Sequence, residues 1–248
     1  MTSLPAELPA HVYRDPCRPA ATARLAAVGT ALVAVSLPLV ALLHVLPPSS
    51  RINPMTRTLS EYALGANGWL FDIAVLALAV GSAAVTAGLV RAGVLAPFSP
   101  ATVLLTVWCV GLGTVVVFEK HNWAVGPSFG GVVHRIASLA AFLALPAGAL
   151  LAARARWRNP GWRTPAAWTR ATAWLSVAAL CPLFYAVGVH LLTGRAWWRV
   201  LPLGAVERLL GLTEVVVVLV LGWWAVRAHS VSTAPTTPPT RKPAETTG

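Results

Sequence analysis

The sequence predicts an all-α fold, a six-helix transmembrane bundle, on the basis of three observations. The chain has 248 residues, its mean hydropathy is +0.68, and 56% of its residues are hydrophobic. Only 11% of its residues are charged, whereas a soluble domain has about a quarter of its residues charged. Six apolar stretches have the ~20 residues that a helix needs to cross the ~30 Å hydrocarbon core of a bilayer. Lipid offers no partner for backbone N–H and C=O groups, so uninterrupted spans of this length are helices.

The six spans follow one another in a single membrane domain, predicted at residues 23–228. The first span is too long for the core of a signal peptide and has no small-residue cleavage site after it, so we expect it to be retained. The second carries alanines at four-residue spacing, which let helix backbones approach closely. Proline occurs inside the first, fourth and fifth spans, where neighbouring helices can compensate for the lost hydrogen bond. The spans are predicted at residues 25–46, 69–90, 101–118, 132–153, 170–192 and 207–226.

Both ends of the chain differ in composition from the spans. Residues 1–22 are rich in proline and alanine with mixed charge, and residues 229–248 form a low-complexity segment rich in proline and threonine. Segments of this composition cannot bury a core. We therefore expect a disordered leader and a disordered tail.

The charged residues divide unevenly between the two sides of the predicted membrane domain. The side of the termini carries twelve Lys and Arg against three acidic residues, and the other side carries seven against five. A Lys/Arg bias in the loops marks the cytoplasmic side, so we expect a multi-pass protein of the cell membrane with both termini in the cytoplasm. The Lys/Arg bias of the cytoplasmic side thus accounts for the net charge of +11. The lipid bilayer is the expected partner, and nucleic acid is not.

The loop between the first two spans is the most distinctive loop in the sequence. Thr58 and Glu61 have the spacing of a capping box, which predicts the start of a short helix. A glycine, Gly65 or Gly68, is suited to end this helix. If the helix lies at the membrane interface, Tyr62 faces lipid or the bundle.

Ionisable side chains within the spans gather at the ends that border the first, third and fifth loops. These residues are His44, Asp72, His134, His190, Glu207 and Glu214. Alternate loops lie on opposite sides of a membrane, so all six are expected at one face. Glu214 lies roughly 10 Å inside that face at 1.5 Å per residue, on nearly the same side of its helix as Glu207. A carboxylate at that depth is costly, which indicates either function or an ion pair with Arg208, Arg135 or Arg57.

Three of these groups also have purely structural explanations. Asp72 lies near a helix N-terminus, where a negative charge is favourable. A histidine such as His134 or His190, taken singly, is more often a hydrogen-bonded packing residue than a ligand, and only the carboxylates at similar depth make the two interpretations comparable.

Three motifs make the chain resemble a known family. They are Thr58-Leu-Ser-Glu-Tyr-Ala-Leu-Gly65 followed by Trp69, His134 before an alanine-rich helix, and the pair Glu207-Arg208 that starts the last span. Together they resemble the uncharacterised prokaryotic integral membrane family catalogued as domain of unknown function 998, over about residues 25–227. The resemblance implies about six helices and brings no established activity. Because the matching motifs contain Ser60, Glu61, His134, Glu207 and Arg208, the resemblance strengthens these residues as candidates for the site.

Arginines at the same face suggest an anionic ligand, because guanidinium groups suit phosphate and carboxylate. Four arginines, Arg51, Arg57, Arg135 and Arg208, would hold the anion. Glu61, Glu207 and His134 would orient them. We therefore expect a polar pocket at the extracytoplasmic face that binds a lipid headgroup or small anion, in a protein of the binding or transport type. The ligand-binding candidates are Arg51, Arg57, Ser60, Glu61, Asp72, His134, Arg135, His190, Glu207, Arg208 and Glu214.

Two other functions remain open on the sequence alone. The chain has no HExxH, CxxC, Walker loop or GxSxG motif, so no catalytic residue is assigned, no cofactor is expected and enzymatic activity is not favoured. A metal-dependent intramembrane hydrolase would need at least three of Asp72, His134, His190 and Glu214 to meet around one cation. An accessory or structural subunit would use its buried charges only to fix helix register. A filled bundle in which every charge is paired would favour this interpretation.

Overall fold

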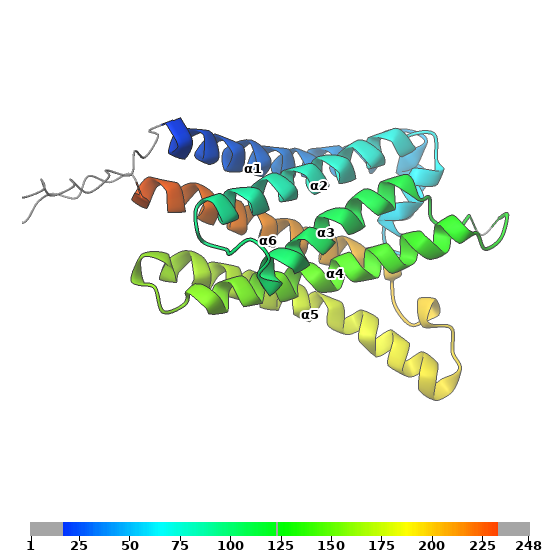
Figure 1. The fold of residues 1–248 in the computed structure, drawn as a ribbon. Coiled ribbons are helices and arrows are strands. Elements are labelled where there is room, and N and C mark those ends of the chain that lie inside the picture. The colour runs from blue at the N-terminus through cyan, green and yellow to red at the C-terminus, as the bar shows by residue number, and fades with distance from the viewer. Residues whose placement is uncertain (1–16, 123, 233–248) are drawn as a thin grey trace, which may run out of the picture.

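The structure is a computed structural model that describes residues 17–122 and 124–232, and every regular element in these ranges is a helix (Figure 1). The six long helices are α1 (Cys17–Leu43), α2 (Gly68–Arg91), α3 (Pro100–Val117), α4 (Phe129–Arg156), α5 (Arg163–Thr193) and α6 (Leu203–Ser232). Four short 3₁₀ helices lie between them, η1 (Ser49–Arg51), η2 (Leu59–Leu64), η3 (Pro160–Trp162) and η4 (Trp197–Arg199). Each long helix contains a stretch long and apolar enough to cross a membrane. The predicted all-α, six-helix membrane bundle is confirmed.

The helices extend beyond the predicted spans at the two ends of the chain. α1 begins at Cys17, within the segment predicted as a disordered leader, and α6 continues to Ser232, within the predicted tail. Extending an existing helix costs far less than nucleating one, so the alanine-rich residues before the first span continue it. The rest of the predicted leader and tail, residues 1–16 and 233–248, lies outside the described residues.

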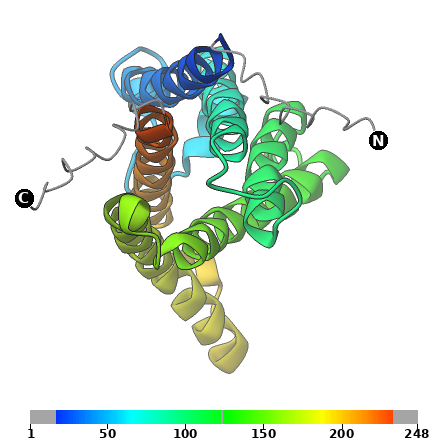
Figure 2. The same ribbon diagram turned by 60° about the vertical axis from the view of Figure 1, so that its left-hand side comes forward.

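The long helices pack against their neighbours in chain order, and α6 contacts four of the others. α1 packs against α2 and α6, α3 against α2 and α4, and α5 against α4 and α6 (Figures 1 and 2). α6 also contacts α2 and α4. The largest buried cluster joins Leu221 and Trp224 of α6 to Val33, Leu105 and Leu145 of three other helices. Side chains of α6 therefore reach the interior of the bundle.

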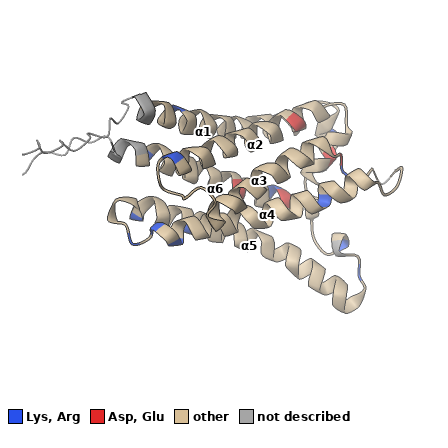
Figure 3. Cartoon of the chain, viewed as in Figure 1, with Lys and Arg blue, Asp and Glu red and all other residues tan. Residues whose placement is uncertain are grey.

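The two ends of the bundle differ in charge (Figure 3). We call the end with loops 44–67, 118–128 and 194–202 the odd-loop end, and the end where α1 begins and α6 finishes the terminal end. Arginines gather around the connection between α4 and α5 at the terminal end, whereas the acidic residues of the described ranges lie in the odd-loop half. These acidic residues are Glu61, Asp72, Glu119, Glu207 and Glu214.

Two glycines allow the backbones of α1 and α2 to touch. A Cβ atom added to Gly81 would lie 2.7 Å from the carbonyl oxygen of Gly29 and 2.8 Å from Cγ2 of Val33. A Cβ atom added to Gly29 would lie 2.8 Å from the carbonyl oxygen of Gly81. These distances are shorter than van der Waals contact, so any larger residue forces the two helices apart. Close approach at small residues is a common way in which helices associate within membranes.

Replacing Gly81 with alanine is therefore expected to lower the free energy of unfolding by about 1–3 kcal/mol, the usual range for overpacking. Gly113→Ala on α3 is the matched control, because nothing lies within 4 Å of a Cβ atom added there. Alanine at that position is expected to stabilise the helix by up to about 1 kcal/mol. Thermal unfolding of both variants in one detergent measures the difference, and equal stabilities would contradict the close α1–α2 contact.

Candidate functional site

Arg208 of α6 binds the loop 44–67 to the bundle at the odd-loop end. Its Nη1 donates to the carbonyl oxygens of Pro54, Arg57 and Gly204, at 2.8, 2.8 and 2.9 Å. Gly204 lies in the first turn of α6, and a Cβ atom there would collide with the carbonyl oxygens of Pro54 and Arg57. Glycine at this position therefore lets the loop lie directly on the helix, within reach of the guanidinium group.

The same guanidinium group also contacts two aromatic residues. Its Nε donates to Nε2 of His44 at 2.9 Å, and its Nη2 donates to the hydroxyl of Tyr62 at 3.3 Å. The rings of His44 and Tyr62 lie with their centroids 5.4 Å apart. Tyr62 is fully buried and packs with Leu43 and Phe71 in a cluster at this end. Of the two predicted orientations of Tyr62, the structure shows the one toward the bundle.

Glu207 and Lys120 hold the start of η2 from two other parts of the chain. Oε2 of Glu207 accepts the backbone N–H of Leu59 at 2.6 Å. Nζ of Lys120, from loop 118–128, donates to Oγ1 of Thr58 at 2.8 Å and lies 3.4 Å from Oε1 of Glu61. Two loops and α6 are thus joined at the odd-loop end by hydrogen bonds between residues distant in sequence.

The predicted capping box at Thr58 and Glu61 is wrong. η2 is a 3₁₀ helix that Thr58 precedes without a side-chain cap, although Gly65 ends it as predicted. The hydroxyl of Thr58 accepts from Lys120 instead, and the carboxylate of Glu61 pairs with Lys120 and, at 3.5 Å, with Arg57. A lysine from a distant loop displaces the local cap because hydrogen bonds to a charged group are the stronger ones.

A cavity of about 450 Å³ lies inside the bundle beside this network. Residues of α1, α2, α3, α4, α6 and η2 line it. Its walls are mainly apolar, with Phe71, Trp108 and Phe142 among them. The polar lining residues are Ser36, His44, Ser138, Glu207, Arg208 and Glu214. Apolar walls with a few polar groups are typical of small-molecule sites, and the volume is in their usual range.

Glu214 lies deeper in the same cavity, two helical turns beyond Glu207. Its side chain is 0% exposed, and neither carboxyl oxygen has a hydrogen-bonding partner among the described residues. Leaving a buried polar group unpaired costs about 1–3 kcal/mol, and more for a charged group. The two glutamates line one cavity at depths that differ by roughly 10 Å, at 1.5 Å per residue. A buried carboxyl group that lines a cavity and has no partner is a strong candidate for contact with a ligand.

His134 and Arg135, predicted to belong to the site, contact the loop 118–128 and do not line the cavity. Nδ1 of His134 is 2.8 Å from the carbonyl oxygen of Phe118. The exposed guanidinium group of Arg135 lies 3.5 Å from Nε2 of His121. This hydrogen bond agrees with the packing role, one of the two roles that the sequence left open for His134.

Four further candidates also lie outside the cavity lining. His190 is exposed on the outer half of α5, which lies apart from the rest of the bundle (Figures 1 and 2), and its Nδ1 is 2.8 Å from the carbonyl oxygen of Arg195. Asp72 is half-buried on α2, and Arg51 is exposed in η1. The hydroxyl of Ser60 lies 3.2 Å from that of Thr58, which precedes η2. Of the predicted candidates, only Glu207, Arg208 and Glu214 line the cavity.

The four residues of the metal hypothesis do not meet. Asp72, His134 and His190 lie outside the cavity that Glu214 lines. Within residues 17–122 and 124–232 there is no group of three or more His, Cys, Asp or Glu residues that could hold a metal ion. The interpretation as a metal-dependent hydrolase therefore lacks its ligand set.

A family model described as "Protein of unknown function (DUF998)" matches residues 25–224, which include the whole cavity and the network around Arg208. The chain belongs to the DUF998 family. The resemblance that the sequence motifs predicted is thereby confirmed. Neither the curated proteins nor the solved structures contain a significant match.

Three residues that line the cavity or belong to the network around Arg208 are absent from the predicted ligand-binding candidates. His44 is bonded to Arg208, and Lys120 holds η2. Trp108 lines the cavity, is only 2% exposed, and donates its Nε1–H to Oγ of Ser82 at 3.1 Å. Two of them have a weak signal in the sequence, because Trp108 lies in the middle of a span and His44 at the end of one. Lys120 has no local signal, because its partners lie about sixty residues away.

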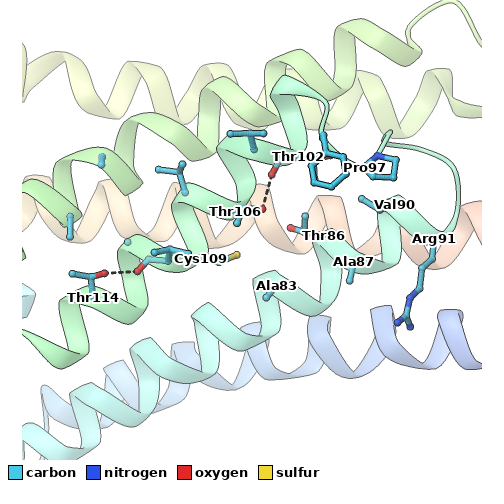
Figure 4. Close-up of a pocket in the computed structure, with 17 residues that line it drawn as sticks. Ala83, Thr86, Ala87, Val90, Arg91, Pro97, Thr102, Thr106, Cys109 and Thr114 are labelled. Carbon is cyan, nitrogen blue, oxygen red and sulfur yellow. Dashed lines mark hydrogen bonds between the residues drawn. The ribbon is translucent and has the colours of Figure 1, made fainter.

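A larger cavity, of about 800 Å³, lies between α2 and α3 (Figure 4). Its lining is mainly apolar, includes Ala83 from the predicted alanine stripe, and reaches Arg91 at the terminal end. Thr106 and Thr114 donate to carbonyl oxygens one turn earlier in α3, and the lining residue Val110 is 62% exposed. This exposed, mainly apolar groove has no carboxyl group among its lining residues, so it suits lipid chains better than a polar ligand. The smaller cavity is therefore the candidate site.

Proposed function

We propose that this DUF998 protein is a membrane protein of the binding or transport type whose inner cavity takes a small amphiphilic molecule. The observation that carries the proposal is Glu214, a fully buried carboxyl group without a partner among the described residues, in the wall of a mainly apolar cavity. In small-molecule sites a few polar groups within apolar walls orient the ligand. The Lys/Arg distribution supports placing the odd-loop end of the cavity on the extracytoplasmic side of a cell membrane.

The interpretation as an accessory or structural subunit fits the same geometry less well. That interpretation expects a filled bundle in which every buried charge is paired. The bundle instead contains a cavity of about 450 Å³, and Glu214 in its wall has no partner among the described residues. A carboxyl group that only fixed helix register would be expected to have a partner on a neighbouring helix.

The cavity lining does not favour a free anion or a phosphate headgroup. Of the four arginines predicted to hold the anion, only Arg208 lines the cavity, and its guanidinium group already binds the loop. Arg51, Arg57 and Arg135 are exposed. The carboxyl groups of Glu207 and Glu214 line the same cavity, and in their ionised form they would repel an anion. We therefore define the proposed ligand by its apolar body and a polar group that is not negatively charged.

Binding of three matched ten-carbon probes tests the proposal. n-Decylamine, n-decanol and decanoate are added separately to the purified protein, below their micelle-forming concentrations. At least one of n-decylamine and n-decanol is expected to form a 1:1 complex in native mass spectrometry and to raise the unfolding midpoint, since a ligand that binds only the folded state stabilises it. Failure of both of these probes in both measurements, or binding of decanoate alone, would refute the proposal.

A further inference from the structure

Both serines in the cavity wall present hydrogen-bond acceptors to a ligand. The hydroxyl of Ser36 donates to the carbonyl oxygen of Val33 at 2.7 Å, and that of Ser138 donates to the carbonyl oxygen of His134 at 2.8 Å. A hydroxyl has one proton and two lone pairs, so these bonds use the donor and leave acceptor capacity. Ser36 and Ser138 both line the cavity, on opposite helices α1 and α4.

The carboxyl groups in the wall add further acceptors. Glu207 uses one oxygen for the backbone N–H of Leu59, and neither oxygen of Glu214 is used. Arg208 is the cation in the lining, and its guanidinium group is bonded to loop carbonyl oxygens, a histidine and a tyrosine. Acceptors therefore outnumber available donors. A complementary ligand supplies donors or positive charge.

The other buried polar atoms without a partner do not compete with Glu214 as a ligand site. They belong to Thr169, Ser176 and Trp224, none of which lines either cavity. Among the described residues, only Glu214 combines an unpartnered buried side chain with a cavity wall.

We infer that Glu214 binds the ammonium group of an apolar amine, so that the ligand class is a hydrophobic amine. The inference rests on the proposed function and names its ligand. An ammonium group has three donors and no acceptor, which complements a carboxylate and nearby hydroxyl oxygens. Pairing makes the buried group neutral overall and removes the cost of an unpartnered carboxyl. Trp108 and Phe142 in the same wall provide aromatic surface, which attracts cations and accepts the apolar body.

The experiment compares the three ten-carbon probes on the wild-type protein and on E214Q, which keeps the shape of the side chain and removes its charge. The wild-type protein is expected to bind n-decylamine about 10- to 100-fold more tightly than n-decanol, the range for a hydrogen bond to a charged group. Decanoate is expected to bind most weakly. E214Q is expected to bind n-decylamine no more tightly than n-decanol, whereas E214D, which keeps the charge, is expected to retain a preference for the amine.

Glu119→Gln is the matched control, because it makes the same chemical change at an exposed position of the odd-loop end outside the cavity. It is expected to keep the wild-type order of affinities. Retention of the amine preference in E214Q would overturn the inference, as would equal or reversed affinities in the wild-type protein. In the case of equal affinities the proposed function stands, because the probes still bind. If no probe binds, both the function and the inference fail.

Discussion

Replacing Arg208 with alanine is expected to lower the free energy of unfolding by about 2–4 kcal/mol and to release the loop 44–67 from the bundle. The side chain donates to three carbonyl oxygens, of Pro54, Arg57 and Gly204, and to His44 and Tyr62. Alanine removes the side-chain donor from all of these acceptors. Thermal unfolding in detergent measures the loss of stability. Hydrogen–deuterium exchange is expected to be faster at the amides of residues 53–62.

Arg57→Ala is the matched control for this prediction, because its side chain is 64% exposed and its ion pair with Glu61 is a surface pair. Exposed pairs contribute at most about 1 kcal/mol. Arg208→Lys is expected to recover only part of the stability, since an ammonium cannot reproduce the planar fork of a guanidinium group. If Arg208→Ala proves as stable as Arg57→Ala, with unchanged exchange in the loop, the network is not what holds the loop in place.

The six spans were predictable because the information for them is local. A stretch of about 20 apolar residues meets the length of the hydrocarbon core wherever it occurs in the chain. Alternation of loops then places Glu207 and Glu214 at one end, and their seven-residue spacing places them on one side of α6. Both indeed line the same cavity.

The arrangement of the candidate residues was less predictable because it depends on how the helices pack. His190 lies at the expected end, yet α5 departs from the bundle there and leaves this histidine exposed. Asp72 and His134 lie near the same end and also miss the cavity. The depth of a residue in the membrane follows from its position along the helix. Whether its side chain points into a cavity depends on how the neighbouring helices pack, which the position along one helix does not reveal.

The role of Arg208 shows a different limit of sequence reasoning. A guanidinium group near a membrane face suggests an anionic ligand, but the acceptors of Arg208 are backbone carbonyl oxygens of an irregular loop. Every residue has such an oxygen, so residue types carry no signal for this bond. Lys120, which displaces the predicted cap at Thr58, escapes for another reason: its partners are the side chains of Thr58 and Glu61, which lie about sixty residues away, so no local pattern pairs them.

Replacing Gly211 with leucine is expected to abolish probe binding while leaving the protein folded. Gly211 lines the cavity between Glu207 and Glu214, and a Cβ atom there would meet only Leu59 Cδ1, at 3.9 Å. A leucine side chain therefore extends into the space proposed for the apolar body of the ligand. Leucine is also the better helix former, so the free energy of unfolding is expected to stay equal or to rise by up to about 1 kcal/mol.

The measurement is the 1:1 complex of each ten-carbon probe in native mass spectrometry, together with the shift in unfolding midpoint. Gly188→Leu on α5 is the control, since this glycine lies outside the cavity and has nothing within 4 Å of an added Cβ atom. That variant is expected to bind the probes as the wild-type protein does. A Gly211→Leu protein that still binds them with wild-type affinity would place the ligand elsewhere, because leucine and the probe cannot occupy the same volume. If Gly211→Leu loses binding, Gly188→Leu keeps it and both variants remain as stable as the wild-type protein, the loss is due to the filled cavity and not to a damaged fold.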